Sequence, residues 1–549
     1  MRLTVSTGLL LLLSGCGQAT VAQAAGENLR VQIPAGLSLA GTARALSGAG
    51  LIGPAPLQQK ARDPAFAASL GIQAAGGLEG YLAPGEYSFP RAAGAEAILR
   101  AMVQRQRSVL ASHREAGRDE RELLVLASLV QRETEIPEDR GLLASVFWTR
   151  LDRDFQLESQ ASLRYALAGG EPVDWSRAVE PGALALDHPC NTFLHAGLPP
   201  QPICSPGPEA IRAAAEARPA AHPFLFRGRD GRYRFGLEDG EAEAIAAVPA
   251  DPEPAQLTHD THYLASNEHR HDHFRPRIDR IGGVFIGVGT DQNFSLAAWA
   301  RSELLVLLDF DQMVVDLHRA YRAAFLHTDS PEDFVKLWKP PSRALREIIR
   351  RTYPRSWQSA WQAARTGRYV IPTRYAEMAE LQRERGVPTF LSDPADYAYV
   401  AQLFRTGRVL IVRGDLTAHR TMRRLAEVLE RCGRKVRLLY VSNAEQYFRY
   451  TPQFRKNVFG LPHDERSLIL RTRTAGPTRH DYIYNAQPFG HFRQCVEQAG
   501  VRHISKLVPR SLFRADRPLY DIPYPFELLV KTHKPKKRGS FPRVKLPRP

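Results

Sequence analysis

Cysteine is scarce in this chain, with 5 among 549 residues, and no group of Cys and His has the spacing of zinc ligands. No metal site is therefore predicted. Long hydrophobic runs are also missing, because the apolar run at residues 9–13 is too short to cross a bilayer. Internal repeats are absent as well. The length predicts about three domain-sized units, because one hydrophobic core does not serve a chain of this size.

The first residues predict export. A single Arg precedes the apolar run, and Leu13-Ser14-Gly15-Cys16 follows it. This order is typical of a bacterial lipoprotein signal, here residues 1–25, in which Cys16 is acylated after cleavage. The alternative is an ordinary secretory signal cleaved after Ala22-Gln23-Ala24. We favour the lipoprotein, since only that interpretation explains the cysteine, and we expect a membrane-anchored protein on the periplasmic side of the bacterial cell envelope.

Export to an oxidising compartment leaves two interpretations of Cys190 and Cys204, which flank a loop rich in Pro and Gly. They close the loop as a disulfide, or both are buried thiols, and spacing alone does not decide between these. Cys432 and Cys495 lie in helix-like runs and are predicted core residues.

Acidic residues are missing from the C-terminal end. Residues 531–549 hold eight Lys or Arg and no acid, which is half of the formal net charge of +16. The composition predicts a disordered basic tail over residues 530–549. In an exported protein such a tail meets anionic lipid or cell-wall carboxylates before nucleic acid, so no nucleic-acid function is predicted. A merely solvated tail is the alternative.

The hydrophobic pattern divides the chain. Residues 29–52 read as strand, turn and helix, and Gly and Pro predict loops at residues 77–89 and 189–208. Helical periodicity is found at residues 95–115, 122–134 and 142–151.

The second half has a different pattern. Residues 236–261 are rich in Ala, Glu, Asp and Pro, which indicates a linker. Short apolar strands then alternate with helices, which predicts a parallel, doubly wound α/β domain over residues 262–515. The predicted strands are residues 284–288, 304–308, 409–412 and 436–441.

One carboxylate lies where a helix should be apolar. At about 100° per residue, Glu133 shares a helix face with Leu126, Leu129 and Val130, whereas Gln131 and Glu135 fall on the far side. Such a Glu is either a structural partner of an Arg or a group whose pKa is raised by burial. A carboxylic acid that keeps its proton near neutral pH is what the general acid of glycosidic cleavage requires.

Four motifs surround this residue in a fixed order. They are Leu78-Glu79-Gly80-Tyr81-Leu82-Ala83-Pro84, Ala127-Ser128-Leu129-Val130-Gln131-Arg132-Glu133-Thr134, Ala144-Ser145-Val146-Phe147-Trp148-Thr149-Arg150-Leu151, and Asn191-Thr192 followed by residues 197–203. Together they resemble the endolytic murein transglycosylase family (MltG/YceG-like), whose members cut peptidoglycan glycan strands. The resemblance implies an α+β first half, with a small LysM-like subdomain over residues 28–75 and a mostly helical catalytic domain over residues 76–235.

The resemblance also implies a mechanism. Glu133 protonates the oxygen between MurNAc and GlcNAc, then takes the proton of the MurNAc 6-hydroxyl as that oxygen attacks C1, which leaves a 1,6-anhydro end. No cofactor is implied for this reaction. The implied partners are glycan strands, the membrane through a lipid anchor, and a cell-wall synthase complex. The predicted substrate-binding residues are Glu79, Asn191, Thr192, Gly197, Leu198 and Pro199, and for Glu79 a structural role as the cap of its loop is the alternative.

Two sequence differences leave a second interpretation open. Where the family usually reads Leu-Gln-Ser/Thr-Asp-Pro-Thr, this chain has Leu157-Glu158-Ser159-Gln160-Ala161-Ser162, and Cys190 replaces the usual Tyr before Asn-Thr. The rival function is an inactive scaffold that binds glycan.

The second half resembles Rossmann-like methyltransferases. Gly287 and Gly289 at a strand end allow a ligand close to the backbone, and Asp309 after the next strand suits a ribose diol. With Asp291 they form a candidate nucleotide-type site. S-adenosylmethionine is the implied cofactor, although it is not expected outside the cytoplasm, so a methyltransferase and a domain that uses its cleft otherwise both stay open. The His-rich cluster at residues 266–273 is interpreted as a solvated loop rather than a metal site.

Overall fold

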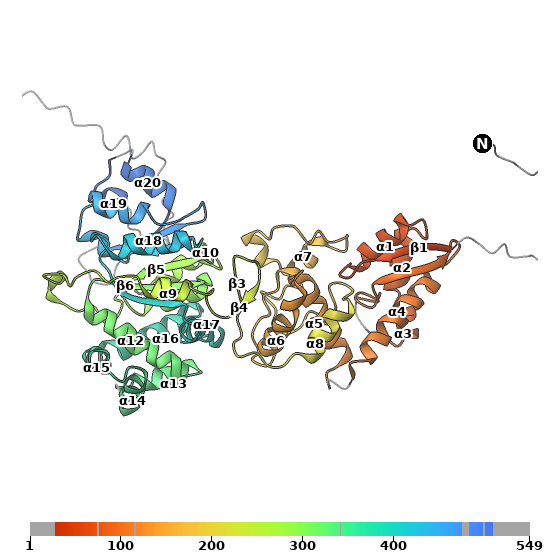
Figure 1. Cartoon of the computed structure of the whole chain (residues 1–549), viewed down its shortest axis with the longest axis horizontal. Coiled ribbons are helices and arrows are strands. Elements are labelled where there is room, and N and C mark those ends of the chain that lie inside the picture. Colours follow the sequence, from red (N-terminus) through yellow and green to blue (C-terminus); the bar gives the residue numbers. More distant parts are fainter. Residues whose placement is uncertain are drawn as a thin grey trace, which may run out of the picture. The chain divides into compact units, whose positions relative to one another are not determined.

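The structure is a computed structural model that describes residues 28–73, 76–114, 117–340, 342–474, 482–497 and 500–508. The chain divides into two compact units, of which the first ends at Pro219 and the second begins at Ala220 (Figure 1). The predicted signal with Cys16 and the predicted basic tail lie outside the described residues. Within the described part of the chain, no helix is long and apolar enough to cross a membrane.

The first unit begins with a two-stranded antiparallel sheet. β1 (Asn28–Ile33) leads through a turn into α1 (Leu39–Gly48), which confirms the predicted strand, turn and helix. The partner strand is β2 (Gly85–Pro90), so the predicted loop over residues 77–89 is wrong from its ninth residue onward. In β2 the aromatic side chains are buried and alternate with exposed residues, a period of two that stabilises a strand. Besides α1, two short helices separate the strands in sequence, α2 (Pro54–Arg62) and α3 (Pro64–Ser69).

Helices make up the rest of the first unit. The central one is α5, which begins where the Asp119 carboxylate accepts the backbone N–H groups of the first turn. Every residue from 123 to 130 is buried, because α5 packs against α6, α7 and α8. The three predicted helices and the loop at residues 189–208 are confirmed to within a few residues. The bounds are α4 (Ala95–Ala111), α5 (Glu120–Glu133), α6 (Arg140–Leu151), α7 (Gln160–Ala168) and α8 (Pro208–Glu216).

The second unit is built on a six-stranded sheet in the order β10-β9-β8-β5-β6-β7. All neighbours are parallel except β10, which runs antiparallel to β9. This is the strand order of doubly wound α/β sheets. Every residue of β5 and β6 is buried, as expected for strands covered by helices on both faces. The strands are β5 (Val284–Val288), β6 (Leu304–Asp309), β7 (Val409–Arg413), β8 (Val436–Tyr440), β9 (Leu468–Thr474) and β10 (Tyr482–Pro488).

Helices cover the sheet and extend one of its connections. α11 (Gln292–Ala300) and α12 (Gln312–His327) contact the strands from one side, and α18 (Thr421–Arg431) contributes to the core on the other. After α12, the described part of the connection from β6 to β7 contains five helices joined by turns and loops, and no strand. Its members are α13 (Pro331–Leu337), α14 (Arg343–Thr352), α15 (Trp357–Thr366), α16 (Val370–Arg385) and α17 (Pro394–Arg405). α19 (Pro452–Phe459) precedes β9, and α20 (Phe489–Glu497) and α21 (Ile504–Leu507) follow β10.

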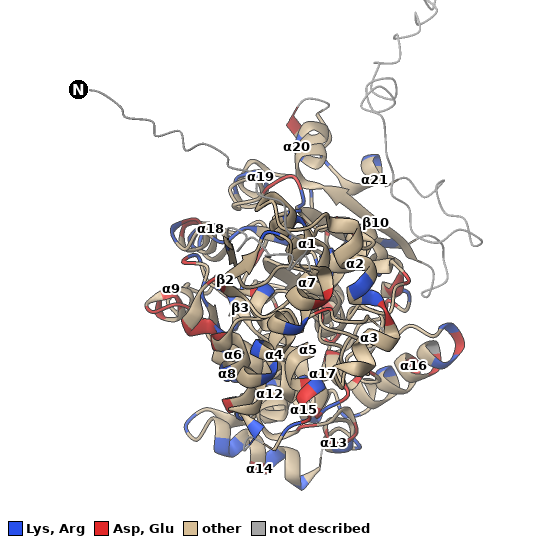
Figure 2. Cartoon of the chain, turned by 90° about the vertical axis from the view of Figure 1, so that its right-hand side faces the viewer, with Lys and Arg blue, Asp and Glu red and all other residues tan. Residues whose placement is uncertain are grey.

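The predicted linker at residues 236–261 packs as part of the second unit. It contains α9 (Glu241–Ala246), which Figure 2 shows as an acidic helix. Ile245 and Val248 belong to the core around the sheet, and Glu241 forms a buried ion pair with Arg434 at 2.6 Å. Residues 236–261 are therefore packed around the sheet, and one of their acids, Glu241, lies in a buried charge pair.

Candidate active site

Glu133 is the last residue of α5. Its helix-face neighbours Leu126, Leu129 and Val130 are fully buried, and Glu133 itself is half-buried. Thr134 ends the helix with an extended backbone. The structure therefore confirms that Glu133 shares a helix face with these buried residues, and its role as the acid stays a prediction.

The Glu133 carboxylate binds the start of another helix with one of its two oxygens. Oε1 accepts the hydroxyl of Ser159 at 2.5 Å and the backbone N–H of Ala161 at 3.1 Å. Ser159 is the N-cap of α7, and its Oγ also accepts the N–H of Ser162 at 3.2 Å. Within the described residues, Oε2 has no hydrogen-bond partner and Glu133 forms no ion pair with Arg or Lys. One oxygen is fixed, and the other is available to a substrate.

The altered motif at residues 157–162 positions Ser159. Arg150 donates to the carbonyl of Leu157 at 2.7 Å and lies 3.6 Å from the Glu158 carboxylate. Glu158 has a φ of 54°, a left-handed conformation that L-residues adopt at a cost of about 1–3 kcal/mol. The strained residue Glu158 directly precedes Ser159, whose hydroxyl contacts Glu133. Sequence reasoning treated this motif only as a departure and did not identify Ser159 or Arg150 as site residues.

Thr192 bonds directly to this segment, and the neighbouring Asn191 bonds to the backbone before it. Thr192 Oγ1 accepts the N–H of Ser159 and contacts Ser162 Oγ, both at 2.9 Å. Asn191 donates to the carbonyls of Leu184 at 3.0 Å and Leu186 at 2.8 Å. Both side chains are buried and already bonded within the protein. The structure shows Thr192 as a support of Ser159 and Asn191 as a contact of residues 184–186, and their contact with sugar stays a prediction.

The loop predicted to line a groove is fixed to α5. Gly197 has a φ of 85°, which favours glycine, and it is followed by the half-buried Leu198 and the buried Pro199. The carbonyl of Pro200 accepts a hydrogen bond from Arg121 at 2.6 Å. Contact of Gly197, Leu198 and Pro199 with sugar stays a prediction.

Gln131 and Ser128 fix the continuation of the same loop. Gln131 Oε1 accepts the N–H of Gly207 at 3.0 Å, and Ser128 Oγ accepts the N–H of Ile203 at 3.0 Å. Gln131, on the opposite face of α5, thus contacts this loop and is not an alternative to Glu133 as the catalytic acid. Gln131 and Ser128 both belong to the motif at residues 127–134, so this motif is the sequence signal for the contact with the loop.

Glu79 lies in the interior of the first unit. Its Oε1 accepts the N–H of Leu39 at 2.8 Å, and its Oε2 accepts the hydroxyl of Tyr165 at 3.1 Å. Gln201 in turn donates to the Tyr165 oxygen at 2.7 Å. Burial raises the pKa of Glu79 to about 7, against the opposing effect of these hydrogen bonds. Glu79 is therefore buried and connects α1, α7 and the loop after residue 200, while its contact with sugar stays a prediction.

Cys190 and Cys204 are both free and buried, so the disulfide interpretation is not realised. Burial raises the pKa of the Cys190 thiol to about 12. Cys204 donates to the carbonyl of Ser128 at 3.4 Å. Cys432 and Cys495 are buried, which confirms them as core residues.

The predicted nucleotide-type residues of the second unit separate into two pairs. Gly289 and Asp309 line a cavity at the carboxyl ends of the strands. Gly287 does not line this cavity. A Cβ at this position would lie 2.2 Å from Asn293 Oδ1, so the missing side chain leaves room for α11. Asp291 is buried in an ion pair with Arg374 at 3.0 Å. Only two of the four residues therefore meet in a space that a ligand can enter.

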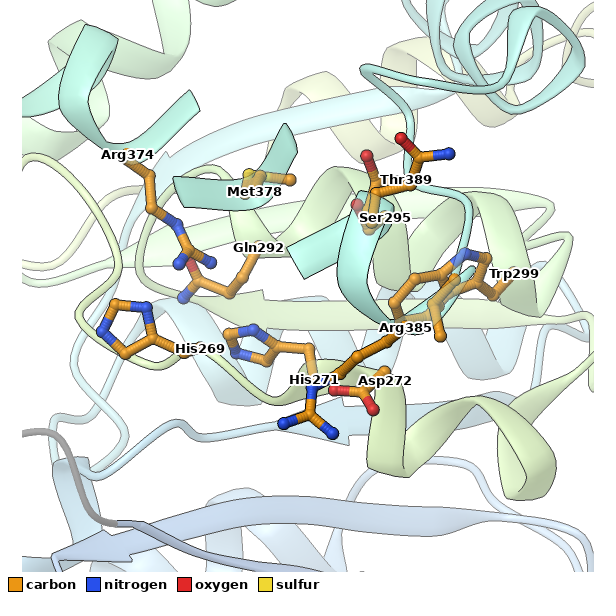
Figure 3. A pocket seen from close by; sticks show the side chains of 12 residues that line it. His269, His271, Asp272, Gln292, Ser295, Trp299, Arg374, Met378, Arg385 and Thr389 are labelled. Carbon is orange, nitrogen blue, oxygen red and sulfur yellow. The ribbon is translucent and has the colours of Figure 1, made fainter. Parts of the chain in front are cut away.

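The His-rich cluster at residues 266–273 is partly buried, which overturns its interpretation as a solvated loop. His271 lies 2.8 Å from the Glu268 carboxylate, which also accepts the hydroxyls of Tyr440 and Thr472. These bonds outweigh burial and lower the pKa of Glu268. Figure 3 shows His269, His271 and Asp272 around a small cavity of about 40 Å³. No group of His, Cys, Asp and Glu among the described residues could hold a metal ion.

Two family models match different halves of the chain, and the first of them extends past the boundary between the two compact units. Residues 8–241 match the model of the YceG-like family, and residues 263–516 match a domain of unknown function, DUF7790. Endolytic murein transglycosylases of Streptococcus pneumoniae serotype 2 (strain D39) and Bacillus subtilis (strain 168) are each 32% identical over 165 and 163 residues. The match covers 29% of this chain, and 30% and 44% of those relatives. The chain thus spans less than half of the length of these curated relatives.

A crystal structure of a YceG-like protein from Listeria monocytogenes aligns with 38% of this chain and 73% of its own. The identity is 26% and the TM-score is 0.34. The sequence matches therefore support a YceG-like, transglycosylase-related N-terminal region. The relation of the second unit to methyltransferases stays a prediction.

Proposed function

We propose that this protein is a lytic transglycosylase that cleaves the MurNAc–GlcNAc bond within peptidoglycan strands, with Glu133 as acid and base. The observation that carries the proposal is the Glu133 carboxylate, in which Oε1 is fixed by Ser159 and Ala161 and Oε2 is unpaired among the described residues. The 32% identity to endolytic murein transglycosylases in this region supports it.

The chemistry follows from one carboxyl group. Protonated Glu133 donates its proton from Oε2 to the glycosidic oxygen, and the bond to C1 breaks with an oxocarbenium-like transition state. The resulting carboxylate then takes the proton of the MurNAc 6-hydroxyl while that oxygen bonds to C1. The products are a free GlcNAc 4-hydroxyl and a 1,6-anhydro-MurNAc end, and Glu133 regains its proton. A second catalytic carboxylate is unnecessary, since the nucleophile belongs to the substrate.

The first test is the product of Glu133→Gln. Uncrosslinked glycan strands are incubated with each protein, and anhydro-MurNAc ends are measured by mass spectrometry. We expect the wild type to form these ends. In Glu133→Gln, which keeps the shape of the side chain and removes its acidic proton, we expect the rate of anhydro-end formation to fall at least about a thousandfold. Glu135→Gln is the matched control, because it changes an exposed neighbouring carboxylate.

The rival function, an inactive scaffold, is favoured by the altered motif at residues 157–162. It predicts glycan binding by the wild type without any anhydro ends. That result would contradict the enzyme. Equal activity of Glu133→Gln and wild type would instead remove Glu133 as the acid.

The proposed location is the periplasmic side of a bacterial membrane, through a lipid on Cys16, beside a cell-wall synthase complex. Cys16→Ala should move the protein from the membrane to the soluble fraction after cell lysis. The proposed reaction needs no cofactor, because the proton and the nucleophile come from Glu133 and the substrate.

A further inference from the structure

A cavity of about 400 Å³ lies at the amino ends of β5, β6 and β8, the edge of the sheet opposite to Gly289 and Asp309. Its lining includes Gly283, Glu303 and Lys435, each of which directly precedes one of these strands. The volume is within the range of small-molecule sites, roughly 300–1,000 Å³. Doubly wound sheets bind their usual ligands at the carboxyl ends of the strands, so the fold by itself does not account for this cavity.

The lining of this cavity is strongly basic. It contains seven Lys or Arg and a single acid, Glu303, among the described residues. Ile281 is the only apolar side chain of this described lining, none of its members is aromatic, and the rest are glycines. Such a surface attracts anions through its charge and its N–H donors, and it offers little to a cation or an apolar ring.

Ion pairs neutralise only part of this charge. They join Arg434 to Glu241 and Glu303, Arg437 to Asp464, Arg229 to Glu238, and Lys435 to Glu430. Arg227 and Arg466 are exposed, and neither forms an ion pair within the described part of the chain. The cavity therefore keeps positive charge that no acid of the described residues neutralises.

Two guanidinium groups of the lining meet at one carbonyl. Arg437 and Arg466 both donate to the oxygen of Ile281, at 3.3 Å and 3.2 Å. Burial lowers the pKa of Arg466, and the nearby Arg437 charge lowers it further. Because a guanidinium has five N–H donors, Arg466 keeps donors for a ligand after bonding to Ile281. An anion bound beside this pair would reduce the repulsion between the two like charges.

Glycines keep the surface between the basic groups uncovered. Gly282 and Gly283 have φ angles of 71° and 68°, which favour glycine. A Cβ on Gly283 would lie 2.4 Å from Arg437 Cγ, so the missing side chain leaves room for the stem of Arg437. A ligand can therefore approach the backbone here as well as the guanidinium groups.

We propose that this cavity binds a ligand with at least two phosphate groups, held by Arg227, Lys435 and Arg466. A guanidinium matches phosphate with two parallel hydrogen bonds, and a phosphate carries more charge and more acceptor oxygens than a carboxylate. The lining offers no aromatic ring among its described residues on which a base could stack. Two sources share this chemistry, a soluble diphosphate compound and the phosphate headgroups of a lipid surface. The cavity belongs to the second unit, so the proposal does not depend on transglycosylase activity.

Two binding measurements on the full chain test the proposal. Calorimetric titration uses inorganic diphosphate, orthophosphate and citrate, and co-sedimentation uses phosphatidylcholine vesicles with and without phosphatidic acid. If the source is soluble, diphosphate should bind more tightly than orthophosphate and citrate by at least about tenfold, because its two phosphates reach separate cations. If the source is a lipid surface, the protein should sediment only with the vesicles that contain phosphatidic acid.

Variants assign the binding to the cavity. Arg227→Gln and Arg466→Gln should each weaken it at least about tenfold, the effect of losing a charged hydrogen bond. Both side chains are exposed, so these variants should fold as the wild type does. Arg351→Gln is the matched control, because it removes the same charge from an exposed position of α14 outside the lining.

Three results would overturn the proposal. The first is that neither diphosphate nor the vesicles with phosphatidic acid bind. The second is that citrate binds and diphosphate binds no more tightly. The third is that Arg227→Gln and Arg466→Gln bind like Arg351→Gln, which would show that only the overall charge of the protein attracts the anion.

Discussion

The hydroxyl of Ser159 lies 2.5 Å from Oε1 of Glu133, and the same oxygen also accepts the N–H of Ala161. The bond connects the C-terminal residue of α5 to the N-cap of α7. It fixes the carboxylate plane, so that the second oxygen takes one direction. A carboxyl group that donates a proton and later removes one from the same substrate requires a fixed orientation of this kind.

Ser159→Ala should lower kcat by about 10- to 100-fold, because a hydrogen bond to a charged group contributes roughly 1.5–3 kcal/mol. Ser159→Thr keeps the hydroxyl and should recover most of the activity. Steady-state release of anhydro ends across a pH series measures both. Ser145→Ala, which removes a serine hydroxyl that bonds only within α6, is the control. An unchanged kcat and pH profile for Ser159→Ala would show that Ser159 caps the helix without positioning Glu133.

Thr192→Val should destabilise the first unit by about 1–3 kcal/mol, since it leaves the Ser159 N–H without its buried acceptor, whereas the Ser162 hydroxyl keeps its bond to the carbonyl of Ser159. Activity should fall as well, because Ser159 loses its support. Thr192→Ser keeps the acceptor and is expected to be close to the wild type. Urea unfolding and the anhydro-end assay check the two effects, and a variant that loses neither stability nor activity would contradict the supporting role.

Glu79 should make the first unit less stable as the pH rises. Its folded pKa is about 7 and its ordinary value is 4.5. Below about pH 4.5 both states hold the proton and stability is highest. Between pH 4.5 and 7 the unfolded state releases the proton and the folded state keeps it, so stability falls by about 3 kcal/mol and then levels off.

Urea unfolding of wild type and Glu79→Gln between pH 4 and 8 isolates this effect. The amide carries no titrating proton, so the difference in unfolding free energy between the two proteins should change over this range. A difference that is independent of pH would show that Glu79 titrates alike in both states.

Asp291→Asn should destabilise the second unit by about 3–5 kcal/mol, because it leaves the buried Arg374 guanidinium without its partner. The side chains of Asp291 and Arg374 are 1% and 4% exposed. Asp333→Asn breaks the exposed pair with Lys336 and should leave stability within error. Thermal unfolding of the full chain, followed by calorimetry, compares them. Equal Tm values for Asp291→Asn and wild type would contradict the structural importance of the buried pair.

Local pattern located most of the elements that carry the candidate site. The 3.6-residue period placed Glu133 beside Leu126, Leu129 and Val130, and all three are buried. The apolar runs located β5 to β8 almost residue by residue. The prediction was wrong where residue composition dominated. Gly and Pro predicted a loop where β2 lies, and acidic residues predicted a linker where Ile245 and Val248 pack in the core.

The sequence by itself determined the helix and strand positions, the apolar faces, and one carboxylate at the edge of such a face. These depend on periods of 3.6 and 2 residues and on neighbours close in the chain. Only the tertiary structure decided which atoms meet. It brought Ser159 to Glu133 across 26 residues and Arg374 to Asp291 across 83 residues, and it directed Asn191 inward to the backbone. Such pairs depend on the path of the chain and on the requirement that buried polar groups form hydrogen bonds. Neither can be predicted from the periodicity of a short segment of sequence.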